Sequence, residues 1–396
     1  MSTQPPPIPG PLFDYLADLE TAVAGIGNTW RPDDPEYRAD VYRQIVMQFS
    51  YGYFAFFHAS AEHPDWAPLW NPVYTLQPNP DDIYLQSPVS PQYRYRVSGT
   101  RGTVKMIMFN TQKNNAGYPG DVDMTGEHYS DLDDRHLQIE PDGTFEILLS
   151  GERPEDHTGN WLQIKPGATM LMVRKRSYDW AGEIDPVLSI ENLDPAPLKP
   201  RLSVDEILQR IKHMAAMPAK ATELFYWMQN QVRDEAGVNV FKPAPIGGAL
   251  SRQIYIPAVF EFEPDEALII ETELPEVRPY WNFQLNDPYY NAIEYVYRMS
   301  STNGHFAKIS SDGKFRAVIS LEDPGVPNWL DPAGFLQGTV YGRWYDCDSC
   351  PTPTLKRVKF AELRDHLPAD TPYVSPEERA AELQERVRGC QRRRRW

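Results

Sequence analysis

The sequence predicts a mainly β protein of the α+β class, with two tandem antiparallel β-sandwich or jelly-roll-like domains. The first observation is an internal repeat, because the pattern of residues 136–174 returns in altered form at residues 305–343. Each copy reads as a strand, an Asp-Gly turn, a second strand, Asn-Trp-Leu and a strand that ends in Arg. A repeat at this separation indicates two copies of one β unit, and therefore an internal duplication. The second observation is composition, since 38 Pro and 24 Gly imply many turns and few long helices.

The elements around the repeats follow from local patterns. Apolar residues at helical spacing predict a helix over residues 12–23, and Asp34-Pro35-Glu36 begins a second helix with Pro in its first turn. From Val73 the residues alternate as in a strand. Ser203 to Glu206 forms a capping box that opens a long apolar helical stripe, which we expect to be kinked or broken at Pro218. A helix in this place would bridge the two β domains.

A chain of 396 residues suits two domains with additions, and we expect five parts. In chain order they are an N-terminal helical region (1–70), the first β-sandwich domain (71–198), an inter-domain helical segment (199–238), the second β-sandwich domain (239–374) and a C-terminal helix with a basic tail (375–396). A Rossmann-type fold is disfavoured because the strands do not alternate with helices.

Charge and hydropathy exclude several kinds of partner. A net charge of −16 argues against nucleic acid, because phosphate binding needs clustered cations. The basic run from Arg392 to Arg395 is expected to be a solvated tail. No stretch approaches the roughly 18 apolar residues of a membrane span, and the start lacks a secretory signal. We therefore expect a soluble, cytoplasmic protein with no membrane partner. Cys347 and Cys350 form a C-x-x-C without a second pair, so two reduced thiols are expected.

Three motifs in the second half carry a resemblance to a known family. They are Tyr280-Trp281-Asn282-Phe283-Gln284, then Asp323-Pro324-Gly325-Val326-Pro327-Asn328-Trp329-Leu330-Asp331 with Gly334, then Gly338 and Arg343-Trp344. This C-terminal part resembles the bacterial family catalogued as domain of unknown function 1214. Asn79-Pro80-Asp81-Asp82-Ile83-Tyr84, followed by residues 93–102, is similar to its N-terminal partner, domain of unknown function 1254. The resemblance implies tandem β-sandwich-like domains and implies no reaction, substrate or cofactor.

The turn that begins at Asn79 brings two carboxylates and a phenol to the start of a strand. Alternation along that strand directs Asp82 and Tyr84 to one face and Asp81 to the other. An acid and a phenol on one face can perform general acid–base chemistry if burial raises the pKa of the acid, so Asp82 and Tyr84 are candidate catalytic residues and Asn79 a candidate substrate ligand. The alternative is an ordinary turn in which the polar side chains bind their own backbone.

The second motif of the resemblance holds two more candidates. Two prolines and a glycine stiffen the loop and suit a wall that holds Asn328 for substrate binding and Asp331 for catalysis. Asn160-Trp161-Leu162 occurs at the matching place of the first repeat, which favours a structural role in which Trp fills the sandwich and Asn bridges backbone groups. Asp331 has Gln163 at the matching position, so it remains the stronger catalytic candidate.

The strand that begins at Tyr280 has an unusual polar pattern. Asn282, Gln284 and Asn286 share one face, and Trp281 takes the other. Trp281, Asn282 and Asn286 are candidate substrate ligands, unless this face of the sheet is simply solvated.

Arg174 and Arg343 end equivalent strands. Such an Arg can bind a substrate carboxylate in bidentate fashion, which makes Arg343 a further candidate ligand. The duplication favours a structural ion pair instead.

Motifs for metals and cofactors are absent from the sequence. No histidine spacing matches a zinc site, and the acidic stretch around His128 does not match a calcium loop, so no metal is expected. No G-x-G-x-x-G opens a helix, and no phosphate-binding loop or nucleophile elbow is present. No nucleotide or flavin motif is therefore found, and the cofactor is unknown.

Three classes of function stay open. The first is an enzyme without an organic cofactor (a lyase, isomerase, cyclase or hydrolase) acting on a small apolar or ring-bearing metabolite. The second is a non-catalytic binder of a lipid-like or sugar-like ligand, for which the aromatic helix segment 51–58 could line a cavity. The third is a structural or assembly module. A buried carboxylate with a perturbed pKa favours an enzyme. The oligomeric state is open, with a homo-oligomer among the alternatives.

Overall fold

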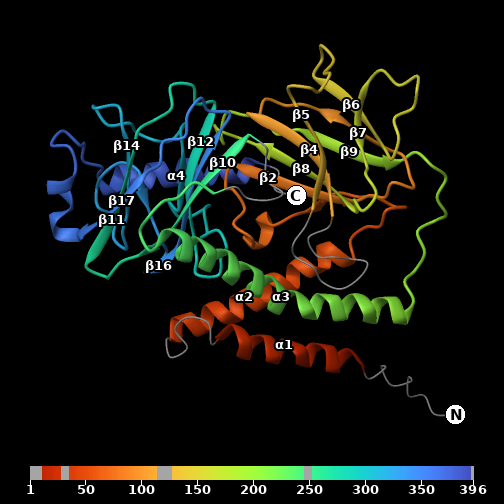
Figure 1. The fold of residues 1–396 in the computed structure, drawn as a ribbon, viewed down its shortest axis with the longest axis horizontal. Coiled ribbons are helices and arrows are strands. Elements are labelled where there is room, and N and C mark those ends of the chain that lie inside the picture. The colour runs from red at the N-terminus through yellow and green to blue at the C-terminus, as the bar shows by residue number, and fades with distance from the viewer. Residues whose placement is uncertain (1–10, 28–34, 114–126, 245–251, 394–396) are drawn as a thin grey trace.

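The computed structural model describes residues 11–27, 35–113, 127–244 and 252–393, which form two β domains beside a layer of helices (Figure 1). The helices of this layer are α1 (Pro11–Gly27), α2 (Pro35–Phe56) and α3 (Val204–Ala236). Figure 1 shows α3 running along the edge of both β domains, with α1 and α2 packed beside it.

The first β domain is a sandwich of two sheets that share one apolar core. Its strands are β1 (Ala67–Pro68), β2 (Asp82–Pro88), β3 (Tyr95–Thr100), β4 (Met106–Gln112), β5 (His128–Asp133), β6 (Thr144–Ser150), β7 (Asn160–Gln163), β8 (Met170–Arg176) and β9 (Val187–Asn192), with the short helix η1 (Asn71–Val73) after β1. One sheet has the order β1-β2-β8-β4-β5 and the other β7-β6-β3-β9.

The second β domain is a sandwich with its own apolar core. Its strands are β10 (Gln253–Glu261), β11 (Glu266–Thr272), β12 (Tyr280–Asn286), β13 (Ser301–Asn303), β14 (Phe315–Ile319), β15 (Trp329–Leu330), β16 (Gln337–Tyr345) and β17 (Thr354–Lys359), followed by the helices η2 (Phe360–His366) and α4 (Pro376–Arg392). The sheets have the orders β10-β16-β12-β13 and β15-β14-β11-β17.

The strand orders confirm the predicted duplication. Replacing β2 to β9 by β10 to β17 in sequence converts the sheets of the first domain into those of the second, and β6/β7 and β14/β15 are the matching parallel pairs. The match extends to side chains, because Asn160 clamps the backbone of Gln138 and Glu146 as Asn328 clamps that of Lys308 and Arg316. The mainly β, two-sandwich fold is therefore confirmed, and the boundaries predicted for the five parts stay predictions.

Helix α3 is continuous through Pro218, so the break expected there is absent. A proline removes one helical hydrogen bond, but Met217 before it and Ala221 within the next turn are buried. Met214 and Met217 belong to one apolar cluster with side chains of the first domain, whereas Ala221 and Phe225 belong to another with side chains of the second. Tertiary packing on both domains thus outweighs the local cost, and the predicted bridging role is confirmed.

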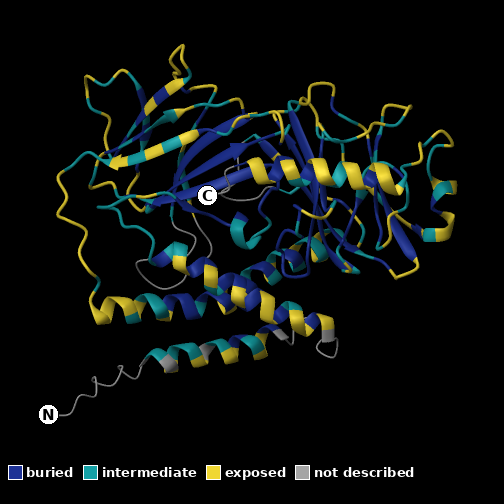
Figure 2. Cartoon of the chain, turned by 180° about the vertical axis from the view of Figure 1, so that it is seen from behind, coloured by how far each residue is buried: buried dark blue, intermediate teal, exposed yellow. Residues whose placement is uncertain are grey.

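The C-terminal helix α4 begins with the expected capping box at Ser375 and Glu378, and it presents an alternating exposed and buried surface (Figure 2). The expectation of a wholly solvated basic tail is wrong for Arg393, which is buried and donates to the carbonyl oxygens of Pro80 and Asp81 at 2.7 and 2.6 Å. A charged donor suits these carbonyls because it forms stronger hydrogen bonds than a neutral one. Residues 394–396 lie outside the described residues.

Cys347, Cys350 and Cys390 are all free thiols. Within the described residues, no helix is both long enough and apolar enough to cross a membrane.

Candidate functional site

The two β domains meet through one sheet of each, which we call the central sheets: β1-β2-β8-β4-β5 and β10-β16-β12-β13 (Figure 1). Their central faces are the faces turned away from the sandwich cores. Arg176 lies at this junction with a side chain only 1% exposed. Its Nε and Nη2 donate to the two carboxylate oxygens of Asp82 at 2.5 and 2.7 Å, and its Nη1 donates to Gln253 at 2.9 Å. The rings of Tyr280 and Tyr345 cover the guanidinium, with centroids at 4.2 and 5.2 Å.

This junction has the pattern of a two-fold interface between the two copies. In the first central sheet Arg176 pairs with Asp82 and Met106, and in the second its equivalent Tyr345 pairs with Gln253 and Tyr280. Arg176 and Tyr345 contact each other, as equivalent residues do near the axis of a symmetric dimer. The duplication therefore places equivalent strands against each other. At this position the first domain has the Arg176–Asp82 ion pair, and the second domain has Tyr345 beside Gln253.

Asp82 is held in its ionised form. Burial acts to raise its pKa, but the charges of Arg176, Arg174 and Arg343 outweigh burial and the pKa is lowered. Tyr84 donates to the Oδ2 atom of Asp82 at 3.1 Å, as expected for two residues on one face. Burial and the neighbouring Asp82 charge raise the pKa of Tyr84, so its phenol keeps its proton. The pair offers a fixed negative charge and a hydroxyl.

Asp81 lies in the turn just before β2, and its carboxylate reaches the same domain junction as Asp82, so the opposite face predicted for it by alternation is wrong. Asp81 joins the first β domain to the second. Its carboxylate accepts from Tyr280, Asn282, Asn303 and Trp180, with donor distances from 2.6 to 3.2 Å. Burial raises the pKa of Asp81, while the hydrogen bonds from Tyr280, Asn303 and Trp180 act in the other direction. The four donors leave it little freedom to act on a ligand, which indicates a structural role.

Asn79 combines the turn role with a domain contact. Its Oδ1 atom accepts from the backbone N–H of Asp81 at 3.1 Å, which is the ordinary turn geometry expected as the alternative. The same oxygen accepts from Asn282 at 2.8 Å, and its Nδ2 donates to Tyr280 at 2.8 Å. Sequence reasoning missed Asn303 and Trp180, which no motif marks and which approach Asp81 only through the tertiary fold.

The amide strand β12 is arranged as predicted. Asn282, Gln284 and Asn286 are buried on the central face, so the alternative of a solvated face is wrong. Gln284 donates to Asn286, which donates in turn to Thr339 at 3.0 Å. Trp281 points to the other side and belongs to the core of the second sandwich, away from the other candidate ligands.

Arg174 and Arg343 occupy equivalent positions on the central strands β8 and β16, and both are buried. Arg343 donates to the amide oxygens of Gln284, Gln77 and Asn282 at 2.6, 2.9 and 3.4 Å. The Nη1 atom of Arg174 is buried and has no hydrogen-bond partner within the described part of the chain. Among the described residues neither Arg forms an ion pair, so the structural ion pair favoured by the duplication is absent there.

Several buried polar atoms without partners surround Arg174. Asn110 Oδ1 and His128 Nε2 lie on the neighbouring strands β4 and β5, and burial and the Arg174 charge lower the pKa of His128 against the opposing charge of Asp131. Tyr51 and Trp70 belong to the apolar cluster that contains Tyr84 and Met172 on the same central face, and burial raises the pKa of Tyr51 against an opposing hydrogen bond from Trp70. The Trp70 and Tyr84 rings are 5.0 Å apart, and the Arg174 guanidinium is 5.8 Å from the Tyr84 ring. We call Arg174, Asn110 and His128 the unpaired cluster, which lies beside Tyr51 and Trp70.

The segment beside this cluster has a strained backbone. Positive φ angles, which residues other than glycine rarely adopt, occur at four positions: 51° at Trp70, 57° at Tyr74, 56° at Leu76 and 43° at Gln77. The segment carries Trp70 at one end and Gln77, which accepts from Arg343, at the other. Backbone strain of this kind gathers at functional sites.

Asp331 lies apart from these residues. Its Oδ2 accepts from Arg298 at 2.8 Å, and its Oδ1 accepts from the backbone N–H of Ala333 at 2.8 Å, so it is held at the end of β15 in an outer sheet. Asn328 is the backbone clamp described above. The structure therefore brings Asn79, Asp82, Tyr84, Asn282 and Arg343 together but leaves Asp331, Asn328 and Trp281 elsewhere.

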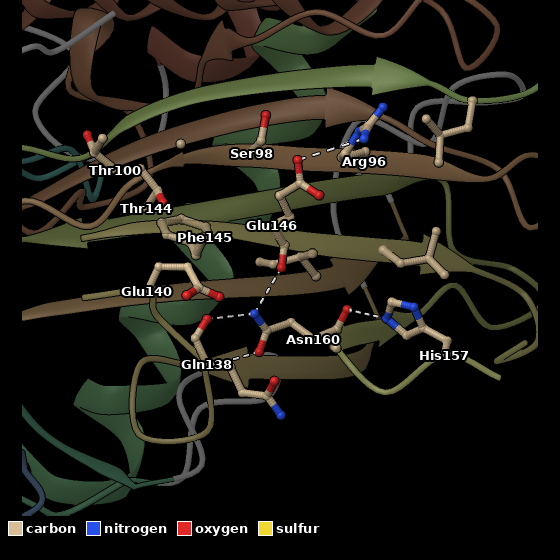
Figure 3. A pocket seen from close by; sticks show the side chains of 15 residues that line it. Arg96, Ser98, Thr100, Gln138, Glu140, Thr144, Phe145, Glu146, His157 and Asn160 are labelled. Atoms are coloured by element: carbon tan, nitrogen blue, oxygen red, sulfur yellow. Dashed lines mark hydrogen bonds and ion pairs between the residues drawn. The ribbon is translucent and has the colours of Figure 1, made fainter. Parts of the chain in front are cut away.

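The pocket in Figure 3, about 730 Å³, lies on the outer sheet of the first domain. Its polar residues are already engaged: Asn160 in the backbone clamp, His157 on the Asn160 carbonyl, and Arg96 with Glu146 (Figure 3). A pocket of about 310 Å³ surrounds Asn328, the equivalent clamp of the second domain. Because both β domains have a pocket at the equivalent clamp residue, these pockets are explained by the shared fold and do not indicate a ligand site. Among the described residues no cluster of His, Cys, Asp or Glu could hold a metal ion.

Comparisons with known proteins give a family match for one part of the chain and a similar fold, but no activity. Residues 88–179 match the family described as "Protein of unknown function (DUF1214)", so this part is a DUF1214-like domain. The match lies in the first β domain, whereas the sequence resemblance was placed in residues 280–344.

A crystal structure of an uncharacterized protein from Burkholderia cenocepacia is 28% identical, with a TM-score of 0.79 over 89% of this chain and 97% of that chain. The VPA0106 protein from Vibrio parahaemolyticus is 12% identical, with a TM-score of 0.44 over 88% of this chain and 100% of that chain. No curated protein matches the sequence.

Proposed function

We propose that the protein binds a small organic molecule between its domains, against the central face of the first β domain. The observation that carries this proposal is the unpaired cluster. A buried polar atom without a partner costs roughly 1–3 kcal/mol. Three such atoms would together cost roughly 3–9 kcal/mol, a large share of the whole stability of a typical domain. Such atoms are usually satisfied by water or by a ligand.

The surroundings of the cluster favour a ligand over scattered water. Water binds isolated polar gaps, whereas ligand sites combine apolar and aromatic walls with a few convergent polar groups. Here Tyr84 and Met172 supply the apolar wall, and the strained segment beginning at Trp70 lies next to it. The positive φ angles of this segment are unfavourable for the backbone, and such strain at a ligand site supports a functional role.

Binding is better supported than acid–base catalysis. A general acid or base must gain and lose a proton near the working pH. Asp82 is fixed as a carboxylate by its bidentate contact with Arg176, and Tyr84 is fixed as a phenol. The catalytic roles of Asp82, Tyr84 and Asp331 stay predictions. In the proposed function Asp82 positions Arg176 and Tyr84.

The test uses the purified full chain. Small molecules released by denaturation are identified by mass spectrometry, and a metabolite library is screened by thermal shift. Hydrogen–deuterium exchange with the best compound should show protection in β2 and β8 but not in β6 or β14. Tyr51→Phe and Trp70→Phe should each weaken binding by about 3–10-fold, the effect of one neutral hydrogen bond. Tyr373→Phe, at an exposed position, is the matched control.

Two outcomes would contradict the proposal. One is a library in which no compound raises the melting temperature and no molecule co-purifies. The other is a compound whose protection maps to the outer sheets and whose affinity is the same for Tyr51→Phe and wild type.

The finer sequence predictions belong to the same proposal. A second DUF1214-like unit in residues 280–344 is supported by the equivalence of the two sandwiches. The likeness of residues 79–102 to domain of unknown function 1254, the cytoplasmic location and a homo-oligomeric state are proposed on the sequence alone.

A further inference from the structure

Two buried arginines at the domain junction form no direct ion pair among the described residues. Three arginines approach the central faces, and Asp82 neutralises one of them, Arg176, through both carboxylate oxygens. Arg174 is 6% exposed and Arg343 is 3% exposed. Both charges help to lower the pKa of Asp82 and oppose the rise in the pKa of Tyr84, which shows that they act on the same small region.

Both arginines act on the carboxylate of Asp82, which Arg176 already binds through both oxygens. Arg343 is held by amide oxygens only, and amides satisfy its N–H groups without cancelling its charge. The Nη1 atom of Arg174 has no acceptor in the part of the chain that the structure describes, and the Arg174 guanidinium lies 5.8 Å from the centroid of the Tyr84 ring. Burial of a charge is unfavourable unless an opposite charge or a strong hydrogen-bond acceptor accompanies it. An anion is the complement that both features require.

We propose that the ligand is an organic acid whose carboxylate is bound by Arg174, with the charge of Arg343 adding to its attraction. The proposal rests on the proposed function and names the chemical class of its ligand. A guanidinium presents paired N–H groups that match the two oxygens of a carboxylate. Because the two arginines are equivalent residues of the duplicated sandwich, the site uses one position of the fold twice.

The neighbouring side chains define the rest of the ligand. Tyr84, Met172 and the rings of Tyr51 and Trp70 form one apolar cluster beside Arg174. Aromatic and thioether groups pack against apolar or ring-bearing ligand bodies. An acid with an aromatic or aliphatic body fits these walls, and inorganic phosphate or sulfate, which has no such body, does not use them.

The test measures binding by isothermal titration calorimetry with three acids and their neutral isosteres: benzoate, phenylacetate and octanoate against the corresponding amides. Inorganic phosphate and sulfate are the further probes. We expect an acid of this panel to bind and its amide to bind at least about 10-fold more weakly. Arg174→Met should weaken binding of the acid by about 10–150-fold, the range for hydrogen bonds to charged groups. Arg174→Lys keeps the charge but loses the paired N–H groups, and it should recover only part of this loss.

A second measurement separates a ligand site from a structural role. Without ligand, Arg174→Met should have a melting temperature equal to or above that of wild type, because it removes an unpaired buried charge. Arg96→Met, on the outer sheet, is the control and should leave binding unchanged. A structural arginine would instead lower the melting temperature when replaced.

The outcomes distinguish this proposal from the proposed function. Equal binding of an acid and its amide would overturn the organic-acid class while leaving an interdomain ligand site in place. Tighter binding of phosphate or sulfate than of every acid would overturn the choice of a carboxylate. A fall in melting temperature for Arg174→Met, with no compound of either charge bound, would overturn both proposals.

Discussion

Asp82→Asn should destabilise the protein strongly, although asparagine keeps the shape of the side chain. The substitution removes the charge that neutralises Arg176, and both side chains of this pair are 1% exposed. Removing one partner of a buried ion pair leaves the other charge uncompensated, which costs about 3–5 kcal/mol. At roughly 2–4 °C per kcal/mol for units of 150–250 residues, the melting temperature should fall by about 6–20 °C.

The assay is thermal and urea unfolding followed by circular dichroism, with a matched control. Asp331→Asn removes the same kind of charge, but its partner Arg298 has a side chain that is 47% exposed, so the loss should stay within about 1 kcal/mol. The double variant Asp82→Leu/Arg176→Met should recover most of the stability, since a buried ion pair replaced by apolar residues is often neutral. Equal losses for the two single variants, or no recovery in the double variant, would refute the reasoning.

Two further predictions follow from burial. Phe225→Asp should lower the free energy of unfolding by more than about 4 kcal/mol, because it places a charge in the apolar cluster where α3 meets the second domain. Leu224→Asp should lower it less, because Leu224 is only partly buried. Equal urea midpoints for the two variants would argue against the bridging contact. The difference in melting temperature between wild type and Asp82→Asn should depend on pH, because the pKa of Asp82 is lowered in the folded state. The contribution of the ion pair to stability is complete above the ordinary carboxyl pKa of about 3.9. It is lost as the pH falls through the lowered folded-state pKa. The gap measured by calorimetry should therefore be constant from pH 7 to about 5 and narrow below about pH 4, and a gap that widens in acid would contradict this assignment.

The sequence was most informative where a pattern is local. Alternation predicted that Trp281 enters a core while Asn282 and Gln284 share the other face, because the period of a strand does not depend on its partners. The repeat predicted the shared backbone clamp of Asn160 and Asn328, because the duplication preserves the loop that it holds. Both inferences needed only neighbouring residues and the comparison of two copies.

The candidate site depends on contacts that local patterns do not contain. The partner of Asp82 is Arg176, 94 positions away, and it lies two residues beyond the Arg174 that the repeat had marked. Asp82 meets Arg176 because of the register in which β2 pairs with β8, and this register cannot be predicted from the local sequence pattern. The continuous helix at Pro218 has the same explanation, since burial against two domains outweighs a local preference.

The contact of Arg393 with the backbone of Pro80 and Asp81 has a consequence for biosynthesis. It joins residues 313 positions apart, so the turn before β2 cannot receive this partner until the ribosome has translated the whole interval. At about 5–20 residues per second this interval takes about 15–60 s. During that time the first β domain can form its own sheets, and the Asp81 carbonyl can accept from the backbone N–H of Ser177, but the charged donor Arg393 is still missing. The support of the domain junction is therefore completed only after Arg393 has been translated, when the first domain has had time to fold.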